Sequence, residues 1–222
     1  MQLSEVLPFW PSLTSDQKKV LKENSTLRRY AKDAVVHAGK EECEGLLIPV
    51  SGQLRAYILS DEGKEITLYR LFARDMCLFS ASCILQSIRF DVFVTAQQET
   101  EVLQIPATIY KTLMQQSLSV ANYTNEVMAS RFSDVMWLMD QVLYKRIDSR
   151  LAAFLMEEVS LCDAQCLALT HEQIARHLGT AREVVSRMLK YFETENLVAL
   201  GRGTVTLIDI PRLSVLAQDS LR

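Results

Sequence analysis

The chain has 222 residues, of which 49% are hydrophobic, with a formal net charge of −3 and a mean hydropathy of +0.06. This length suggests one large domain or two modest ones, with enough hydrophobic residues for a sizeable core. The small negative charge argues against indiscriminate binding to polyanions. We expect neither a signal peptide nor a membrane span, and therefore a cytoplasmic protein, because no long uncharged apolar run is present.

The first half of the chain predicts a short helical lead-in followed by a β-rich domain. Residues 1–25 fit the lead-in, with Ser15 as the N-cap of a helix. From Leu27 to Ile105 short β-type runs alternate with glycine-containing turn signals, a spacing typical of a compact β sandwich or barrel. The expected strands are Ala34–His37, Leu46–Val50, Leu54–Leu59, Ile66–Arg70, Asp91–Ala96 and Glu101–Ile105.

A long helical region follows Pro106. A short helix is expected at residues 107–116, and residues 118–144 contain no Gly or Pro. Apolar residues in this second stretch recur at spacings of four, three, four and three, the pattern by which two identical helices pair. Packing of this helix only on its own β-domain is the alternative, and its apolar face is wide enough for both arrangements. The predicted seam consists of Met128, Phe132, Val135, Met139 and Val142. A further helix is expected at Asp148–Val159.

Two helix-start signals lie ten residues apart in the last third of the chain. Each fits a capping box, in which a hydroxyl and a side chain three residues later satisfy free backbone N–H groups. Between them, Gly179 can adopt the positive φ that ends a short helix. The pattern predicts a helix-turn-helix with its second helix near Ala181–Glu195, and a plain helical hairpin is the alternative. The two capping pairs are Thr170 with Gln173, and Thr180 with Glu183.

The start of that second helix displays a polar face. Positions i, i+1, i+4 and i+5 lie on one side of a helix, and this end is the one that enters a DNA major groove. Arginine can donate two bonds to guanine, glutamate can accept from cytosine, and serine can bond to either kind of group. A solvated face with an i,i+4 ion pair is the alternative. The expected base contacts are Arg182, Glu183, Ser186 and Arg187, and the expected phosphate contacts are Thr170, Thr180, Lys190 and Arg202.

These residues carry a resemblance to a known family. From Leu169 to Ile210 the chain resembles the DNA-binding domain of the Crp/Fnr family of bacterial transcription regulators. The run REVVSR, residues 182–187, is close to its recognition-helix signature, and the strands expected at 197–200 and 204–208 resemble its wing. The segment PVSGQLRAYILSDEGKEITLYRL resembles the strand-turn-strand of the family's β-roll, so the resemblance covers nearly the whole chain.

The resemblance implies an α+β fold with three parts. These are a cyclic-nucleotide-binding-like β-roll (a double-stranded β-helix) at residues 1–117, a dimerisation helix at 118–145, and a winged helix-turn-helix at 146–222. It also implies a homodimer that binds palindromic double-stranded DNA, with RNA polymerase as a further partner and a signal sensed in the β-roll. A β-roll ligand-binding module whose helical tail docks a protein partner is the alternative. We expect no enzyme, since a catalytic metal in a β-roll needs several histidines and the β-region has only His37.

The predicted effector pocket departs from the family pattern. Nucleotide-binding members carry a Gly-Glu pair that holds the ribose and an Arg-Ser pair that holds the phosphate. Here Leu78-Phe79 and Phe90-Asp91 stand at these places, and a one-residue gap that moved Arg89 into position would not restore the carboxylate. We therefore expect an unknown effector other than cyclic AMP, because a carboxylate repels the phosphate. A filled core without ligand is the alternative. The pocket residues are Cys77, Leu78, Phe79, Ser80, Ser82, Cys83, Phe90 and Asp91.

The chain has five cysteines, and their spacing does not fit a common metal site. Disulfides are not expected in a cytosolic chain, and the spacings differ from those of zinc sites. Family members with an iron–sulfur cluster have a close N-terminal cysteine group, whereas the first 42 residues here contain none. We expect no metal or cofactor and favour buried, inert cysteines. The alternatives are a redox-sensing dithiol or metal site at Cys77 and Cys83, and a reactive pair at Cys162 and Cys166. The five are Cys43, Cys77, Cys83, Cys162 and Cys166.

Overall fold

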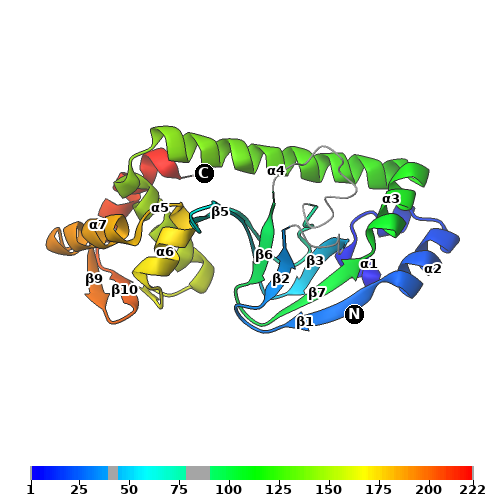
Figure 1. The fold of residues 1–222 in the computed structure, drawn as a ribbon, viewed down its shortest axis with the longest axis horizontal. Coiled ribbons are helices and arrows are strands. Elements are labelled where there is room, and N and C mark those ends of the chain that lie inside the picture. The colour runs from blue at the N-terminus through cyan, green and yellow to red at the C-terminus, as the bar shows by residue number, and fades with distance from the viewer. Residues whose placement is uncertain (1, 40–44, 79–90, 222) are drawn as a thin grey trace. The chain divides into compact units, whose positions relative to one another are not determined.

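A computed structural model describes residues 2–39, 45–78 and 91–221 (Figure 1). The chain forms two compact units, and the long central helix is shared between them. The first unit consists of residues 1–59 and 68–135, and the second consists of residues 60–67 and 136–222. Among the described residues no helix is both long and apolar enough to cross a membrane.

The N-terminal lead-in contains α1 (Leu3–Val6), a 3-10 turn (Trp10–Ser12) and α2 (Ser15–Asn24). The N-cap of α2 is Thr14, so the prediction of Ser15 was wrong by one residue. Gln17 stands three residues after Thr14, and the two form a reciprocal capping box. The Thr14 hydroxyl accepts from the Gln17 N–H at 3.3 Å, and the Gln17 side chain accepts from the Thr14 N–H at 3.0 Å.

Two β-sheets follow, as the spacing of short strands predicted. Residues from both sheets share one core, which contains Leu47 and Val102 from the first sheet and Leu54 and Val94 from the second. The first sheet has the antiparallel order β1-β7-β3, formed by Thr26–Tyr30, Thr100–Ile105 and Leu46–Ser51. The second has the order β2-β6-β4-β5, formed by Val35–Ala38, Phe93–Ala96, Leu54–Leu59 and Glu65–Leu71.

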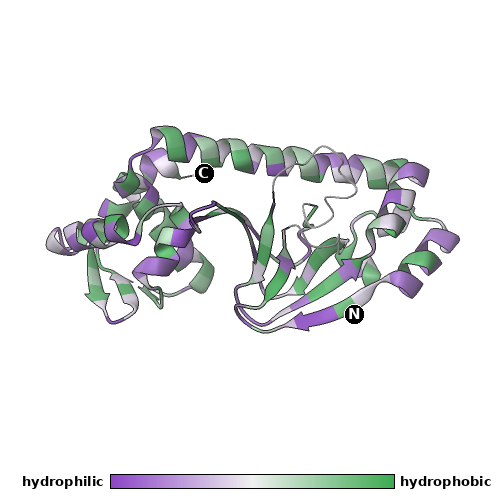
Figure 2. Ribbon diagram, in the orientation of Figure 1, coloured by the Kyte–Doolittle hydropathy of each residue, from purple (hydrophilic) through white to green (hydrophobic). Residues whose placement is uncertain are grey.

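The helices α3 (Ala107–Gln116) and α4 (Leu118–Tyr144) have the predicted bounds. Hydrophobic and hydrophilic residues alternate along the whole of α4 (Figure 2). The beginning of α4 packs on the core of the first unit, where Val120 is fully buried. Tyr110 of α3 is also fully buried, and its hydroxyl lies 2.7 Å from the Thr124 hydroxyl of α4.

The second unit is a helical domain with a small sheet. Its sheet has the order β8-β10-β9, and the hairpin of β9 and β10 lies beside α7 (Figure 1). One hydrophobic cluster joins α5, α6, α7, the small sheet and α8. The elements are α5 (Ile147–Cys162), β8 (Cys166–Leu167), α6 (His171–Leu178), α7 (Arg182–Thr194), β9 (Val198–Gly201), β10 (Thr204–Leu207), α8 (Ile210–Ala217) and a 3-10 turn (Gln218–Ser220).

Candidate nucleic-acid interface

Helix α6 begins at the predicted capping box. The Thr170 side chain accepts from the Gln173 N–H at 3.2 Å, and the Gln173 side chain accepts from the Thr170 N–H at 2.9 Å. At the other end Gly179 has φ +65°, a conformation that glycine adopts without a steric cost. The half-buried Arg150 guanidinium donates to the Leu178 carbonyl at 2.5 Å, and its partial burial lowers the pKa of Arg150. Side chains thus form hydrogen bonds with free backbone groups at both ends of this short helix.

Helix α7 follows after a tight turn. Its N-cap is Ala181, which forms no side-chain cap, so the predicted cap by Thr180 was wrong. The reason lies in the preceding helix, because the Thr180 N–H still donates to the Ala175 carbonyl at 3.1 Å. Thr180 therefore completes the last turn of α6, and α7 starts one residue later than that cap required.

The two faces of α7 separate as the sequence pattern predicted. Its buried face points into the domain core with Val185, Leu189 and Phe192, none of which is exposed to solvent. Its other face exposes the predicted base-contact residues Arg182, Glu183 and Arg187. Since the helix is anchored on one side and charged on the other, the charged side is available to a ligand.

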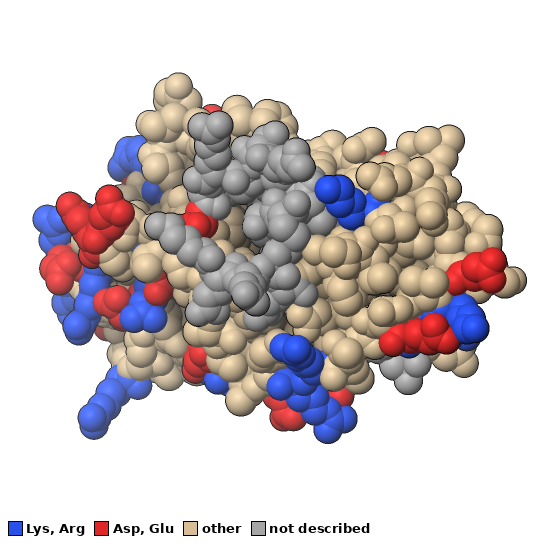
Figure 3. All heavy atoms as spheres, turned by 45° about the vertical axis from the view of Figure 1, so that its right-hand side comes forward, with Lys and Arg blue, Asp and Glu red and all other residues tan. Residues whose placement is uncertain are grey.

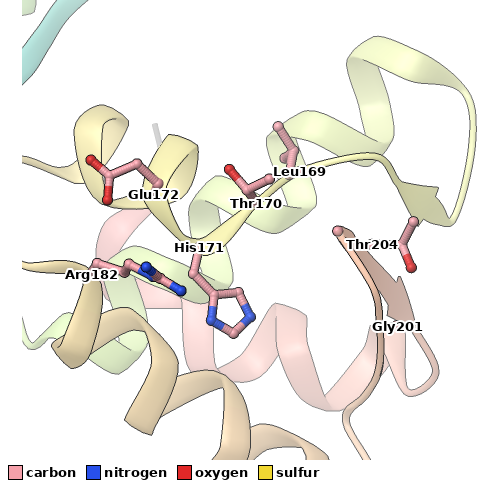
Figure 4. Close-up of a pocket in the computed structure, with 8 residues that line it drawn as sticks. Leu169, Thr170, His171, Glu172, Arg182, Gly201 and Thr204 are labelled. Atoms are coloured by element: carbon pink, nitrogen blue, oxygen red, sulfur yellow. The ribbon is translucent and has the colours of Figure 1, made fainter.

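A groove of about 440 Å³ lies between the start of α6, the start of α7 and the β9–β10 hairpin. Figure 4 shows His171 and Arg182 reaching into this groove from the two helices, opposite Gly201 and Thr204. The groove is also lined by Leu169, Thr170, Glu172 and Gly203. A helix N-terminus presents free N–H groups with a partial positive charge, so a groove between two such ends suits an anionic group such as a phosphate.

One hydrogen bond links the two helices across the helix-turn-helix. Nδ1 of His171, the first residue of α6, lies 2.8 Å from the hydroxyl of Ser186 in α7. Ser186 is half-buried, unlike the neighbouring Arg187. His171 was not among the predicted DNA-contact residues, because a linear pattern does not place a residue of one helix opposite a residue 15 positions later.

The predicted phosphate contacts differ in their surroundings. Lys190 donates to Glu193 at 2.7 Å, and this hydrogen bond lowers the pKa of Glu193. Arg202 is exposed at the turn of the β9–β10 hairpin. On the molecular face in Figure 3, basic and acidic residues are interspersed rather than gathered into one basic patch. Attraction for a polyanion would therefore come from a few positions, in line with the net charge of −3.

Comparison with known proteins fits this geometry. Residues 149–216 match the model of the Crp-like helix-turn-helix domain, and residues 27–117 match the model of the cyclic nucleotide-binding domain. A crystal structure from Eubacterium rectale, of a chain assigned to the Crp/Fnr family of transcriptional regulators, is 52% identical in sequence. The match covers 96% of this chain and 99% of the other, with a TM-score of 0.94. The chain belongs to the Crp/Fnr family.

Two more distant matches are proteins whose names state the signal to which they respond. Vfr of Pseudomonas aeruginosa, a cAMP-activated global transcriptional regulator, is 28% identical over 81% of this chain and 88% of its own. The c-di-GMP responsive global regulator CLP of Xanthomonas campestris shares the fold alone, at 19% identity with a TM-score of 0.73, over 88% of this chain and 99% of its own. The family assignment makes the chain a DNA-binding transcription regulator of the Crp/Fnr type.

In this Crp/Fnr chain the predicted effector pocket lies partly outside the described residues. Cys77 and Leu78 are buried in the core of the first unit, and Asp91 is half-buried. Of the other predicted pocket residues, Phe79, Ser80, Ser82, Cys83 and Phe90 lie outside the described part of the chain. Within that part, no group of three His, Cys, Asp or Glu side chains could hold a metal ion.

A polar cluster that the sequence analysis missed lies beside Cys77. The Tyr69 hydroxyl is 4.0 Å from the Cys77 sulfur, and burial raises the pKa of Tyr69 well above its ordinary value. The Arg131 guanidinium from α4 lies 4.6 Å from the centre of the Tyr69 ring. It also donates to Asp134 at 2.9 Å and lies 3.9 Å from Asp75. The surroundings of Cys77 thus contain a phenol and a paired guanidinium in addition to apolar groups.

The free cysteines of the described chain differ in exposure. Cys77 is fully buried, as expected, whereas Cys162 and Cys166 are exposed. The expectation of buried cysteines was therefore wrong for these two, since they lie at the end of α5 and in the short edge strand β8. Cys43 and Cys83 lie outside the described residues.

The predicted dimer seam on α4 is only partly covered within the chain. Phe132, Met139 and Val142 are 68%, 48% and 44% exposed. Met128, at the other end of the seam, packs against the core of the first unit, and Val135 is half-buried. Large apolar side chains along one helix face rarely stay exposed to water in a working protein, so this face is suited to burial against a partner.

Proposed function

We propose that this regulator acts as a homodimer that binds an inverted repeat in double-stranded DNA and responds to a signal sensed in its β-roll. The observation that carries the proposal is the charged, exposed face at the N-terminus of α7, whose opposite face is buried in the domain core. This exposed face borders the groove between the N-termini of α6 and α7. A recognition helix in a helix-turn-helix contacts base edges with its N-terminal residues, and this end of α7 has the side chains for that role.

The contacts divide by chemistry. Arg182 and Arg187 would bond to guanine, Glu183 to cytosine, and Ser186 to a neighbouring base. Phosphates would lie against the residues around the groove and the hairpin, since helix N-termini and basic side chains face the DNA backbone there. The phosphate contacts are Thr170, Thr180, Lys190 and Arg202.

Dimerisation would use the exposed seam of α4. Two copies of Phe132, Met139 and Val142 would cover each other in a coiled coil and remove these side chains from water. A two-fold dimer presents two identical recognition helices, which can enter successive major grooves on one side of DNA, so the site would be palindromic. RNA polymerase is the further partner through which such a protein would change transcription.

The signal would be a small molecule in the β-roll other than cyclic AMP. The names of two matched proteins support this openness about the effector, since Vfr is cAMP-activated, whereas CLP, which shares the fold, is c-di-GMP responsive. The replacement of Gly-Glu by Leu78-Phe79 and of Arg-Ser by Phe90-Asp91 removes the expected nucleotide contacts. A neutral or apolar ligand fits this composition. Oxidation of Cys77 is less favoured, because a fully buried thiol reacts slowly.

Selection from a random DNA library with the full-length protein tests the proposal. We expect recovery of an inverted repeat whose half-sites are about 10 base pairs apart, with G·C pairs in each half-site. Mobility shifts should show a preference of about 10³-fold or more over a scrambled sequence at physiological salt. Equal binding to selected and scrambled DNA would contradict the proposal and favour a protein partner for the helical domain.

A further inference from the structure

We infer that His171 is a specificity-determining residue, which fixes the direction and the hydrogen-bonding polarity of the Ser186 hydroxyl at the DNA-facing side of α7. The inference rests on the proposed DNA contact by α7 and deepens it. It starts from the 2.8 Å hydrogen bond between His171 Nδ1 and Ser186 Oγ, which joins the first residue of α6 to the second turn of α7.

The bond restrains a side chain that otherwise turns freely. A serine hydroxyl samples three rotamers, and in each it can donate one hydrogen bond and accept two. Ser186 lies one helical turn after Arg182 and is half-buried, so the bond to His171 selects the rotamer in which Oγ faces α6. His171 itself is held in place, because it follows the capped Thr170 and lines the groove together with Arg182.

The bond also decides what Ser186 can offer to a base. If Nδ1 carries no proton, Ser186 must donate its only proton to the ring, and just its lone pairs remain for amino groups of adenine or cytosine. If Nδ1 is protonated, Ser186 accepts from the ring, and its proton is free for guanine or thymine oxygens. In the first state Ser186 can only accept from the DNA. In the second state its proton is free for the DNA and one lone pair remains, whereas an unbonded serine keeps its proton and both lone pairs free. The bond therefore narrows what Ser186 can offer to a base.

The proposed role of His171 can be distinguished from a direct contact between His171 and a phosphate. Of the residues that line the groove around His171, Glu172 from α6 and Arg182 from α7 are charged, and Gly201, Gly203 and Thr204 from the hairpin are not. A histidine that served only as a phosphate contact would add affinity equally to every sequence. A histidine that acts through Ser186 changes the preference among bases at one position.

The experiment is binding-site selection followed by affinity measurements with the full-length wild-type protein, His171→Phe, Ser186→Ala and the double variant. The position that Ser186 contacts is the one at which Ser186→Ala loses the base preference. We expect the wild type to favour one polarity there, adenine and cytosine or guanine and thymine, by about five-fold or more. His171→Phe should reduce this preference to less than two-fold, and the double variant should not differ from Ser186→Ala.

Controls separate the possible causes of a loss. Glu172→Gln changes a neighbouring groove residue without touching the bond, so it should change affinity alike for all sequences and keep the base preference. His171→Leu replaces His171→Phe if the aromatic variant lowers Tm. A base preference that persists in both His171 variants would overturn the inference and leave the proposed function intact. A preference that Ser186→Ala does not alter would overturn the inference and also remove Ser186 from the proposed base contacts, while the proposed binding to an inverted repeat would stand. Only a wild type without sequence preference would refute the proposed function.

Discussion

Lys190 donates a hydrogen bond to Glu193 across 2.7 Å, on the exposed side of α7 beyond its predicted base-contact face. The same carboxylate also accepts from the Leu200 N–H at 3.4 Å, so it links α7 to β9. The ammonium group of Lys190 is thus already compensated by a carboxylate. A DNA phosphate at this place has to compete with Glu193 for the lysine.

Replacing the two partners separately tests this competition. Lys190→Ala should weaken binding to all DNA sequences alike and lower the slope of log K against log salt by about one, since one phosphate contact is lost. Glu193→Gln should have the opposite effect and strengthen binding, because the lysine is released for the phosphate. Fluorescence anisotropy between 50 and 300 mM salt, about the range in which such slopes are measured, provides both values. A loss confined to one base position would contradict the assignment.

Arg187→Ala should behave differently from Lys190→Ala. We expect a cost of about 1–3 kcal/mol on the selected site and a relaxed preference at one base pair, because a bidentate contact to guanine carries sequence information. Mobility shifts with a set of single-base variants of the site measure both effects. Arg28→Ala is the matched control, since Arg28 is an exposed arginine of β1. Equal losses on every sequence would make Arg187 a phosphate contact.

Much of the fold could be predicted because its elements have local signals. The bounds of α3 and α4 agree with the prediction, since Pro106 and a change of periodicity mark them. Strand β1 was missed because it is an edge strand whose side chains are mostly exposed, so it has no alternation of apolar and polar residues. Helix α8 was not predicted, although its start has a local signal, since the Asp209 side chain accepts from the Arg212 N–H and Pro211 stands in the first turn.

The candidate site could be predicted only in part. The charged face of α7 follows from helical periodicity, which depends only on local spacing. The bond between His171 and Ser186 depends on the angle between two helices, and a sequence does not show that angle. The cluster of Tyr69, Cys77 and Arg131 could not be predicted from the sequence either, because it joins residues from a strand, a loop and α4.

The seam of α4 can be tested at Phe132. This side chain is 68% exposed within the chain, so Phe132→Asp should change the stability of one copy by about 0.5 kcal/mol or less. In a dimer paired along α4 the variant buries two carboxylates at the two-fold axis and should be monomeric with weakened DNA binding. Ser130→Asp adds the same charge at an exposed position off the seam and should remain dimeric. If Phe132→Asp sediments as a dimer, the dimer interface does not lie along this seam.

Tyr110 should make the stability of the first unit depend on high pH. Burial raises the pKa of its phenol to about 12 from 10.0. Between these values the unfolded chain binds fewer protons than the folded one, so stability is complete below pH 10 and falls as pH rises. At pH 11 the loss should be about 1.4 kcal/mol relative to pH 8. Tyr69 and Tyr123, whose pKa values burial also raises, add losses of their own. In urea unfolding the total loss should therefore be smaller in Tyr110→Phe than in the wild type by about 1.4 kcal/mol, and an equal loss in both would refute the assignment.

We expect that the protein does not bind cyclic nucleotides. The expected ribose carboxylate and phosphate arginine are replaced by Phe79 and Phe90, with Asp91 next to the latter. Cys77 and Leu78 are buried in the core, and neither side chain is a carboxylate that could hold the ribose. An anionic nucleotide would therefore lose its hydration and meet an aromatic surface and a like charge, which is unfavourable at both steps.

Isothermal titration with cyclic AMP and cyclic GMP should show no binding up to about 1 mM, which corresponds to about −4 kcal/mol. The same protein sample should bind its selected DNA site, so that a negative result cannot come from misfolding. The Phe79→Glu, Phe90→Arg variant restores one group of each missing pair, and any gain in nucleotide affinity should appear there first. Micromolar binding of either nucleotide by the wild type would mean that other residues replace the missing carboxylate and arginine, and the pocket would then have to accept an anion after all.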